Sequence, residues 1–452
     1  MTPRRVADRT RIAAAAVCLA LLATFGCPAP PEDGDPTDAA APESSAGTGN
    51  AGGAGAAGDA TTDPTAAGSV ARADDGAASM PAWPSDTARA RTREFFEKVS
   101  ADEIRLTIDD LAGFGTRHTL SDTTSDERGI GAARRYLLER FESIAAASGR
   151  TGDLMPKAYL DRHIQPADGR RVPEDTDIVN VALELPGTDP EARKRRYYVI
   201  GHYDSRASDP MDATIDAPGA NDDASGTAIA VELARVLAAE RFESTLVFMP
   251  TAGEEQGLYG ADLHAKAAKA AGLDVRAVLS NDIVGDPTSP LGGRHDDAVR
   301  VFSEPFPASP DEETVRTLRR LSGTSDSPSR QLARYVEELG RLYELPTRAM
   351  LIFRTDRFLR GGDHTAFNRQ GFHAVRFTEV SENYDRQHQD VRLEDDVQFG
   401  DLPQNVDATY VANVARLNLA ALTHLAEAPS APNDVRIVTA QLAIDTTLRW
   451  TR

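Results

Sequence analysis

The feature that most constrains this chain is a set of short apolar runs that lead directly into acids or a histidine. The runs are Tyr197–Ile200, Thr245–Met249 and Val275–Ser280, and the residues that follow them are His202, Asp204, Glu254, Glu255 and Asp282. Such runs, separated by helical patterns, predict strands of a mostly parallel sheet. Because ligands bind at the carboxyl ends of the strands in an open parallel sheet, these side chains are expected to converge at one edge.

The remaining pattern extends this prediction to an α/β fold in which helices flank a mostly parallel central sheet. Further strands are expected at Ile178–Leu185 and His373–Phe377. Apolar residues three or four positions apart predict helices at Ala132–Ile144, Gly226–Ala239, Ser329–Tyr343 and Ala408–Leu425. The stretch Asp286–Pro328 is long and mostly polar, and it is expected to be an excursion from the sheet.

Two helices are expected ahead of the sheet. Phe95, Phe96 and Val99 recur on one helical face. Ser100 and Glu103 have the spacing of a capping box, in which the serine hydroxyl and the glutamate side chain each bond a free backbone N–H at the start of a helix.

Composition divides the chain into four parts. Residues 1–26 have a basic start and an apolar run too short to span a bilayer, which predicts a signal peptide. Residues 27–84 consist largely of Ala, Gly, Asp, Thr, Ser and Pro, and they predict a disordered stalk because they cannot bury enough apolar surface. Residues 85–428 form the predicted main domain. Residues 429–452 are a predicted β-rich extension that resembles the opening strands of a truncated fibronectin type III-like sandwich.

Cysteine content and charge limit the setting and the partners. Of the two cysteines, Cys18 would leave with the signal peptide, so no intramolecular disulfide is expected in the mature chain. The segment that ends at Cys27 loosely resembles a bacterial lipobox. We therefore expect a periplasmic or extracellular protein, attached to a membrane only through a lipid at Cys27 or else released by plain cleavage nearby. The formal charge of -20, without a clustered basic surface, argues against a nucleic-acid partner.

The converging carboxylates would repel one another unless a cation lay between them. The glycine-containing stretch Gly219–Gly226 adds Asp222 to the group, because it lies just before a predicted helix and its glycines allow tight turns. Mixed imidazole and carboxylate donors suit zinc, and two ions that share one carboxylate need about five protein ligands. The candidate ligands are His202, Asp222, Glu255, Asp282 and a later histidine.

Several of these motifs occur together in one known family. GHYDS, GANDDASG, TAGEEQGLYG, NDIVG and a distal histidine resemble the MH-clan di-zinc aminopeptidases, which are metallopeptidase family twenty-eight. The resemblance covers roughly Asp102 to Leu425. It implies the zinc-exopeptidase fold, with residues 85–428 as the catalytic domain and two zinc ions per chain.

The resemblance also implies a role for each matching residue. Asp222 would bridge both ions, and His202 and Asp282 would complete one site. Glu255 and the distal histidine would complete the other. Glu254 would be the general base, and Asp204 would accept the hydrogen bond from the imidazole that precedes it and so fix its tautomer.

Two histidines compete for the distal position, His364 in a GGDH segment and His388 after the strand expected at His373–Phe377. In the family an Asp-His pair before a helix usually lies near the site without binding metal, and the ligand follows the next strand. The resemblance therefore implies His388. The family commonly has a tyrosine directly before this histidine, whereas here Tyr384 precedes it by four positions, so an oxyanion role for Tyr384 lacks support.

The other acids and histidines of these segments have simpler interpretations. Asp223 is expected to be a turn or helix-cap residue and not a metal ligand. The residues expected to be ordinary loop acids or ordinary histidines are Asp209, Asp212, Asp216, His118, His264 and His424.

The predicted function is a secreted or lipid-anchored zinc exopeptidase that hydrolyses the N-terminal peptide bond of peptides with a free amino terminus. An MH-clan carboxypeptidase or dipeptidase is an alternative, because the same metal core serves both ends of a peptide. A single-zinc glutaminyl cyclase is another. The contrasting class is a non-catalytic receptor or binding module on this fold, which the complete ligand set and the presence of Glu254 disfavour. The sequence does not indicate the oligomeric state or the preferred side chain of the substrate.

Overall fold

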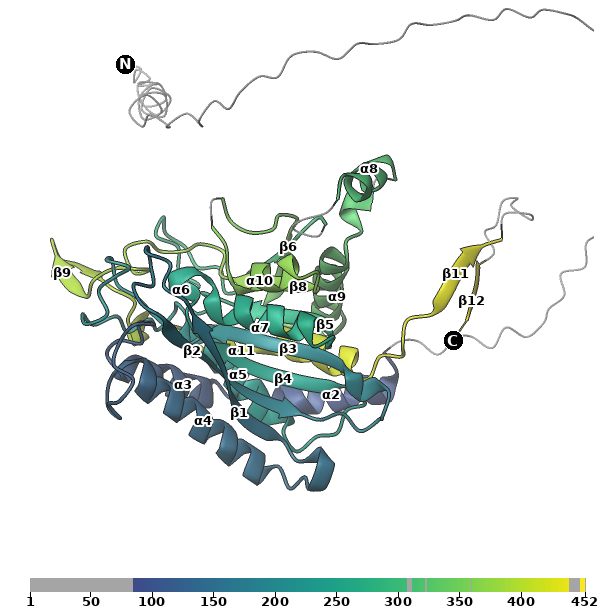
Figure 1. Cartoon of the computed structure of the whole chain (residues 1–452), viewed down its shortest axis with the longest axis horizontal. Coiled ribbons are helices and arrows are strands. Elements are labelled where there is room, and N and C mark those ends of the chain that lie inside the picture. The colour runs from purple at the N-terminus through teal and green to yellow at the C-terminus, as the bar shows by residue number, and fades with distance from the viewer. Residues whose placement is uncertain (1–83, 307–310, 322, 359, 439–447, 452) are drawn as a thin grey trace, which may run out of the picture. The chain divides into compact units, whose positions relative to one another are not determined.

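A computed structural model describes residues 84–306, 311–321, 323–358, 360–438 and 448–451 (Figure 1). The predicted signal peptide and all but the last residue of the predicted stalk lie outside the described residues. Within the described part, no helix is both long and apolar enough to cross a membrane.

The centre of the fold is an eight-stranded sheet with the order β1-β2-β4-β3-β5-β8-β6-β7. Strands β3, β4, β5 and β8 are parallel neighbours, which confirms the mostly parallel centre. Strands β1 and β2 on one side and β6 on the other join antiparallel to their inner neighbours. The strands are β1 (Lys157–Gln165), β2 (Thr176–Leu185), β3 (Arg195–His202), β4 (Thr245–Thr251), β5 (Asp274–Asn281), β6 (Ala298–Ser303), β7 (Arg348–Ile352) and β8 (Ala374–Thr378).

The stretch Asp286–Pro328 is not simply an excursion, because it contains β6, which pairs with β7 and β8. The prediction missed this strand because charged and polar residues surround its short apolar core. The edge strand β1 was missed for a related reason, since no residue of its nine is fully buried and its apolar signal is weak. Both faces of β4 are buried, which explains its continuous apolar run.

Helices cover both faces of the sheet (Figure 1). Alternate residues of a strand point to opposite faces, and accordingly Val199 joins one buried apolar cluster while Tyr198 and Ile200 join the other. The larger cluster includes residues of α2 (Asp86–Lys98), α3 (Ala101–Gly113), α4 (Gly129–Ala147), α5 (Ala224–Leu237), α9 (Pro328–Leu342) and α11 (Ala408–Ala426). The smaller cluster includes residues of α7 (Tyr259–Ala270) and α10 (Asp363–Arg369). The short helix α6 (Glu254–Gly257) follows β4, and α8 (Glu312–Arg320) precedes α9.

The expected capping box at the start of α3 forms only in part. The Ser100 hydroxyl accepts the N–H of Glu103 at 3.2 Å, as predicted. The N–H of Ser100, however, donates to Glu232 of α5 at 2.6 Å and not to Glu103. A glutamate on a neighbouring helix therefore replaces the local partner and joins α3 to α5.

The C-terminal extension forms its own two-stranded antiparallel sheet. Strands β11 (Asn433–Ile437) and β12 (Leu448–Thr451) pair with each other and not with the central sheet. Every residue of β11 is exposed. Another small hairpin, β9 (Arg392–Glu394) with β10 (Val397–Phe399), lies between β8 and α11 in the sequence.

Strand β3 and helix α5 approach so closely that only glycine fits at the contact. A Cβ on Gly226 would lie 2.1 Å from the carbonyl oxygen of Asn281, and a Cβ on Gly201 would lie 2.4 Å from the carbonyl carbon of Gly226. These are backbone atoms, which cannot rotate away as a side chain can. The close approach fixes α5, and with it the loop that carries Asp222, against the ends of β3 and β5.

We expect Gly226→Ala to lower the free energy of unfolding by about 2–3 kcal/mol, because the helix must move away from β5 to make room. Urea denaturation measures the change. Gly113→Ala is the matched control, since a Cβ there has no atom within 4 Å, and its effect should be neutral or slightly stabilising. Equal stability of the two variants would show that α5 is not held at this contact.

Candidate metal centre

The structure brings the predicted ligands together at the carboxyl ends of the parallel strands. His202 is the last residue of β3, and Asp282 directly follows β5. Glu255 lies in α6 just after β4, and Asp222 lies two residues before α5. His388 comes from the loop after β8. These five side chains come from five segments; Asp222, Glu255, Asp282 and His388 line one cavity, and His202 lies buried against Asp222. All except His388 are less than a tenth exposed.

Asp222 lies between the two histidines and faces each with a different oxygen. Its Oδ1 is 3.1 Å from Nε2 of His202, and its Oδ2 is 3.0 Å from Nε2 of His388. Asp282 approaches the first imidazole from another side, with Oδ1 3.9 Å from Nε2 of His202. Glu255 approaches the second, with Oε1 3.0 Å from Nε2 of His388. The residues thus form two groups that share one carboxylate.

The donor set fits a divalent metal at each group. The donor atoms of His202, Glu254 and Asp282 lie within 4.8 Å of one another, and so do those of Asp222, Glu255 and His388. The Nε2 atom of His202 is buried, and although Oδ1 of Asp222 lies 3.1 Å away, no acceptor in the described part of the chain has hydrogen-bond geometry toward it. A buried ring nitrogen without a partner, surrounded by carboxylates, is what a metal ligand requires. Imidazole and carboxylate donors in this mixture suit zinc.

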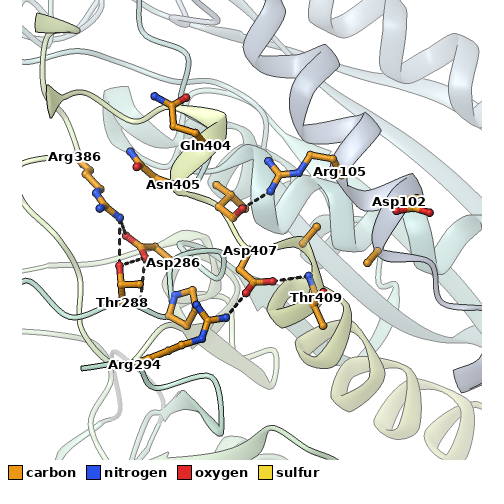
Figure 2. A pocket seen from close by; sticks show the side chains of 14 residues that line it. Asp102, Arg105, Asp286, Thr288, Arg294, Arg386, Gln404, Asn405, Asp407 and Thr409 are labelled. Atoms are coloured by element: carbon orange, nitrogen blue, oxygen red, sulfur yellow. Dashed lines mark hydrogen bonds and ion pairs between the residues drawn. The ribbon is translucent and has the colours of Figure 1, made fainter. Parts of the chain in front are cut away.

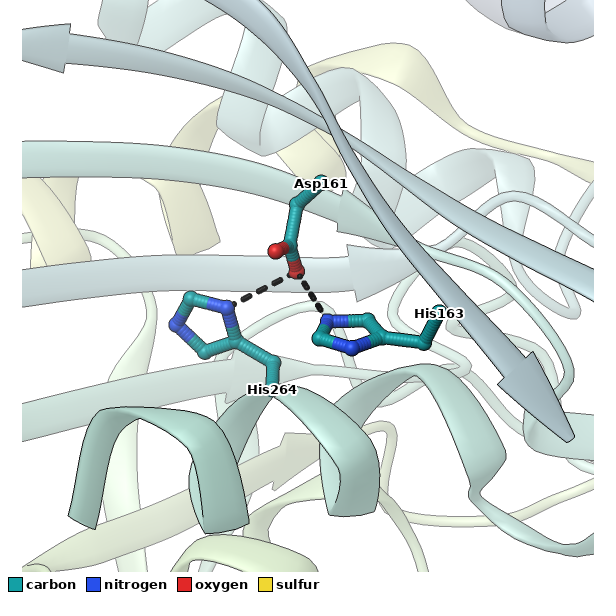
Figure 3. A group of neighbouring side chains, drawn as sticks. All are labelled: Asp161, His163 and His264. Atoms are coloured by element: carbon teal, nitrogen blue, oxygen red, sulfur yellow. Dashed lines mark hydrogen bonds and ion pairs between the residues drawn. The ribbon is translucent and has the colours of Figure 1, made fainter. Parts of the chain in front are cut away.

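A third cluster, of two histidines and an aspartate, has no buried ring nitrogen without a partner among the described residues. Figure 3 shows His163 of β1 and His264 of α7 directed at one oxygen of Asp161, at 3.0 and 2.9 Å. Asn180 donates to the same oxygen at 2.9 Å, and the second ring nitrogen of His264 lies 3.3 Å from the Tyr198 hydroxyl. These hydrogen bonds account for both nitrogens of His264, so the cluster is a polar connection between β1 and α7.

The charges of the centre shift the pKa values of its members. Burial lowers the pKa of His202, but the charge of Glu254 and the contacts with Asp222 and Asp282 raise it well above its usual value. Burial also disfavours the charged form of His388, yet Glu255 and Asp222 raise the pKa of His388 to about 9. Burial raises the pKa of Asp222, but the two imidazoles hold it well below its usual value. The cavity therefore favours positive charge around an ionised Asp222.

Burial and the neighbouring negative charges stabilise the protonated form of Glu254. Burial, followed by the charges of Asp282 and Glu255, raises the pKa of Glu254 well above its usual value, although His202 opposes this shift. Glu254 lines the cavity and is only partly buried. It therefore holds a proton more readily than an exposed glutamate does.

The carboxylate of Asp204, which was predicted to accept a hydrogen bond from His202, has shorter contacts with backbone N–H groups than with the imidazole. Nδ1 of His202 lies 3.1 Å from the backbone carbonyl oxygen of Asp204, whereas the nearest carboxylate oxygen is 3.6 Å away, too far for a hydrogen bond. The carboxylate instead accepts the backbone N–H groups of Glu254 and Glu255, each at 3.2 Å, and the Thr119 hydroxyl at 2.9 Å. The backbone of Asp204 orients the imidazole, and its side chain positions the Glu254-Glu255 pair.

Several residues of the centre were not anticipated from the sequence. Arg376 of β8 is fully buried, and its Nη2 lies 2.9 Å from Asp282. The carboxylate of Asp401 accepts the N–H of Asp222 at 2.7 Å. Arg206 lies 2.9 Å from Glu255, and its Nη2 is 2.7 Å from Nδ1 of His388. Arg206 directly follows the GHYDS motif, but nothing local to the sequence indicates these long-range partners.

The other residues that were weighed for a role in the metal centre belong to neither ligand group. His364 is fully buried, and its Nε2 is 2.8 Å from the carbonyl oxygen of Thr355, so it belongs to neither ligand group. Tyr384 is 56% exposed and does not line the cavity. Asp223 is the N-cap of α5, where it accepts the N–H of Gly226 at 2.9 Å, in agreement with the expected cap.

The cavity over the two groups has a volume of about 490 Å³ and includes Glu254 and several arginines in its wall. Another cavity, of about 530 Å³, lies beside α3 and the start of α11 (Figure 2). Its arginines already have partners: Arg386 pairs with Asp286, Arg294 pairs with Asp407, and Arg105 donates to the carbonyl oxygen of Val406. Of these two cavities, only the first is lined by candidate ligands.

Imidazole and carboxylate groups gathered at the strand ends of a mostly parallel α/β sheet are typical of metal-dependent hydrolases. The chain belongs to peptidase family M28: the profile described as "Peptidase family M28" matches residues 180–409. A probable zinc metalloprotease of Leptosphaeria maculans is 44% identical over 355 residues, which are 78% of this chain and 80% of that protein. A probable zinc metalloprotease of Pyricularia oryzae is 43% identical over 359 residues, 78% of this chain and 70% of that protein.

Solved structures agree with the fold. The crystal structure of the LapA aminopeptidase of Legionella pneumophila covers 76% of this chain and 76% of its own, with a TM-score of 0.53 and 18% sequence identity. The predicted α/β fold and the predicted family are therefore confirmed.

The position of Asp204 predicts a measurable effect on the centre. In Asp204→Asn one of the two backbone N–H groups of Glu254 and Glu255 would face an amide nitrogen, which cannot accept it. We expect a loss of about 1–3 kcal/mol in the free energy of unfolding and a 10- to 100-fold loss in affinity for Zn²⁺. Urea denaturation and competition with a fluorescent zinc chelator measure the two changes.

Asp209→Asn is the control, because Asp209 is exposed in the same loop and its carboxylate bonds only the N–H of Met211 among the described residues. Its effect should stay within about 0.5 kcal/mol. Unchanged zinc affinity in Asp204→Asn would show that the Glu254-Glu255 pair holds its position without this carboxylate.

Proposed function

We propose that the chain is a zinc exopeptidase that hydrolyses the N-terminal peptide bond of peptides, with two zinc ions per chain. The observation that carries this proposal is the placement of Asp222, whose two oxygens face two separate imidazoles at 3.1 and 3.0 Å. A carboxylate in this position suits a bridge between two ions. Membership of peptidase family M28 and the similarity to probable zinc metalloproteases support the choice of zinc and of peptides.

The proposed ligands form two sets. Asp222 would belong to both, His202 and Asp282 to one, and Glu255 and His388 to the other. When bound, the ions supply Lewis acidity, which activates water and polarises the carbonyl group of the scissile bond. The buried contacts of Arg376 with Asp282 and of Asp401 with the backbone of Asp222 keep the carboxylates in place before substrate arrives.

Glu254 is the proposed proton carrier. Its side chain lines the cavity beside His202 and Asp282, while its backbone N–H is held by Asp204. The carboxylate would take a proton from the attacking water and deliver it to the nitrogen of the leaving amine. Transfer of a proton by a positioned carboxylate in this way is general acid–base catalysis.

The preference for a peptide end rests on the cavity and on the fold. A volume of about 490 Å³ lies in the range of sites for small ligands and is large enough for the end of a peptide. The fold is similar to that of LapA, an enzyme named as an aminopeptidase. We therefore propose that substrates carry a free amino terminus.

The first test concerns metal content. We expect about two zinc ions per chain in the active protein, and we expect His388→Ala to lose one of them. His364→Ala, which also removes a buried histidine, should retain both. Mass spectrometry of the bound metal after dialysis distinguishes the variants. A single ion in fully active wild-type protein would contradict the two-metal proposal, and loss of zinc in His364→Ala alone would assign the distal ligand to His364.

The second test separates the two adjacent glutamates. Glu254→Gln should retain both zinc ions but lower kcat by a factor of about 100 to 10,000, the usual contribution of a positioned general base. Glu255→Gln should lose zinc, because the amide is a poor substitute for a ligating carboxylate. Zinc content and kcat are measured on both variants with the same aminoacyl substrate. Wild-type turnover in Glu254→Gln would rule out this residue as the base.

A further inference from the structure

The wall of the cavity over the metal centre carries five arginines: Arg171, Arg206, Arg357, Arg360 and Arg369. This is unexpected in a chain with 70 acidic residues and only 50 lysines and arginines. The four acids in the same wall are Asp222, Glu254, Glu255 and Asp282, which already have roles in the proposed mechanism.

Two of the five arginines are neutralised by the protein. Arg206 lies 2.9 Å from Glu255, and Arg357 forms ion pairs with Asp356 and Glu382. The other three form no ion pair with any acid in the described part of the chain. Arg171 lies next to the ligands, because its Nη1 donates to the backbone carbonyl of Glu255 at 3.1 Å. The side chains of Arg360 and Arg369 are exposed and make no hydrogen bond among the described residues.

Hydrogen bonds connect the backbone near these two side chains to the rest of the fold. Buried Arg376, which pairs with Asp282, also donates to the carbonyl oxygen of Gly361 at 2.8 Å and so fixes the residue next to Arg360. Arg369 ends α10, a helix whose first residue, Asp363, bonds the Thr251 hydroxyl at the end of β4. The two guanidinium groups therefore extend from anchored positions at the cavity wall.

We infer that Arg360 and Arg369, with Arg171, form a subsite that binds a carboxylate of the substrate close to the scissile bond. A guanidinium group presents paired N–H donors that match a carboxylate. The zinc ligands and Glu254 leave no other free acid in this wall to neutralise the three arginines. The inference rests on the proposed exopeptidase function and names its substrate class: short peptides with an acidic side chain or a free C-terminal carboxylate beside the cleaved bond.

The test compares substrates that differ only by a carboxylate and a carboxamide. Glutamyl against glutaminyl p-nitroanilide places the charge before the cleaved bond. Leucyl-glutamate amide against leucyl-glutamine amide places it on the side chain after the bond, and leucyl-glycine against leucyl-glycine amide places it at the C-terminus. We expect kcat/KM to be at least about tenfold higher for the acid in one of these pairs, and that pair identifies the source of the carboxylate.

The double variant Arg360→Gln/Arg369→Gln should reduce this acid-to-amide ratio at least about tenfold. Arg316→Gln is the matched control, because Arg316 is an exposed arginine of α8 outside this cavity, and its ratio should equal that of the wild type. A wild-type ratio below about threefold in all three pairs, or a ratio that survives in the double variant, would overturn the subsite and leave the arginines as solvated side chains.

A separate measurement distinguishes failure of the subsite from failure of the proposed function. If zinc-loaded wild-type protein cleaves none of the peptides, including the neutral ones, the exopeptidase proposal fails. Calorimetric binding of leucyl-glutamate amide and leucyl-glutamine amide to zinc-loaded Glu254→Gln protein then tests the arginines without turnover. At least about tenfold tighter binding of the acid, lost in the arginine double variant, would support the subsite, and equal affinities would refute it.

Discussion

The structure of the site depends on one buried carboxylate, that of Asp222, which is approached by an imidazole on each side. Burial of an ionised carboxylate is unfavourable unless positive charge lies close to it. The imidazoles of His202 and His388 face its two oxygens, and Arg376 supplies a buried positive charge to neighbouring Asp282. The same arrangement that compensates for burial of Asp222 also brings together two groups of donor atoms that fit a divalent cation.

A second layer of buried acids holds the backbone that carries these ligands. Asp223 accepts the N–H of His202 at 2.9 Å and that of Ile283 at 3.3 Å, and so joins the end of β3 to the residue after Asp282. Asp401 and Asp204 act in the same way on the backbones of Asp222 and of the Glu254-Glu255 pair. Hydrogen bonds from backbone N–H groups thus fix loops that belong to no strand or long helix, which preorganises the ligands.

The sequence was sufficient to predict the convergence of the ligands, because parallel strands end at the same edge and the acids directly follow apolar runs. It was not sufficient for strands β1, β6 and β7, whose apolar signals are short or only partly buried. Nor could it show that the Asp204 carboxylate bonds backbone N–H groups. Nδ1 of His202 lies 3.1 Å from the backbone oxygen of Asp204 and 3.6 Å from its carboxylate, and tertiary packing decides which of the two is nearer. Arg376 and Asp401 were missed because their partners are distant in sequence and their own segments carry no motif.

The arginines at the cavity wall show that the net charge of the chain does not describe the local charge of the cavity. A formal charge of -20 would repel an acidic peptide at long range. Salt screens such interactions over about 8 Å at physiological ionic strength, so the distant acids contribute little at the cavity. Inside it, Asp222 and Asp282 are compensated by imidazoles and by Arg376, whereas Arg360 and Arg369 have no acidic partner among the described residues. The charge that a substrate meets beside the metal centre is therefore set by a few local guanidinium groups and opposes the sign of the whole chain.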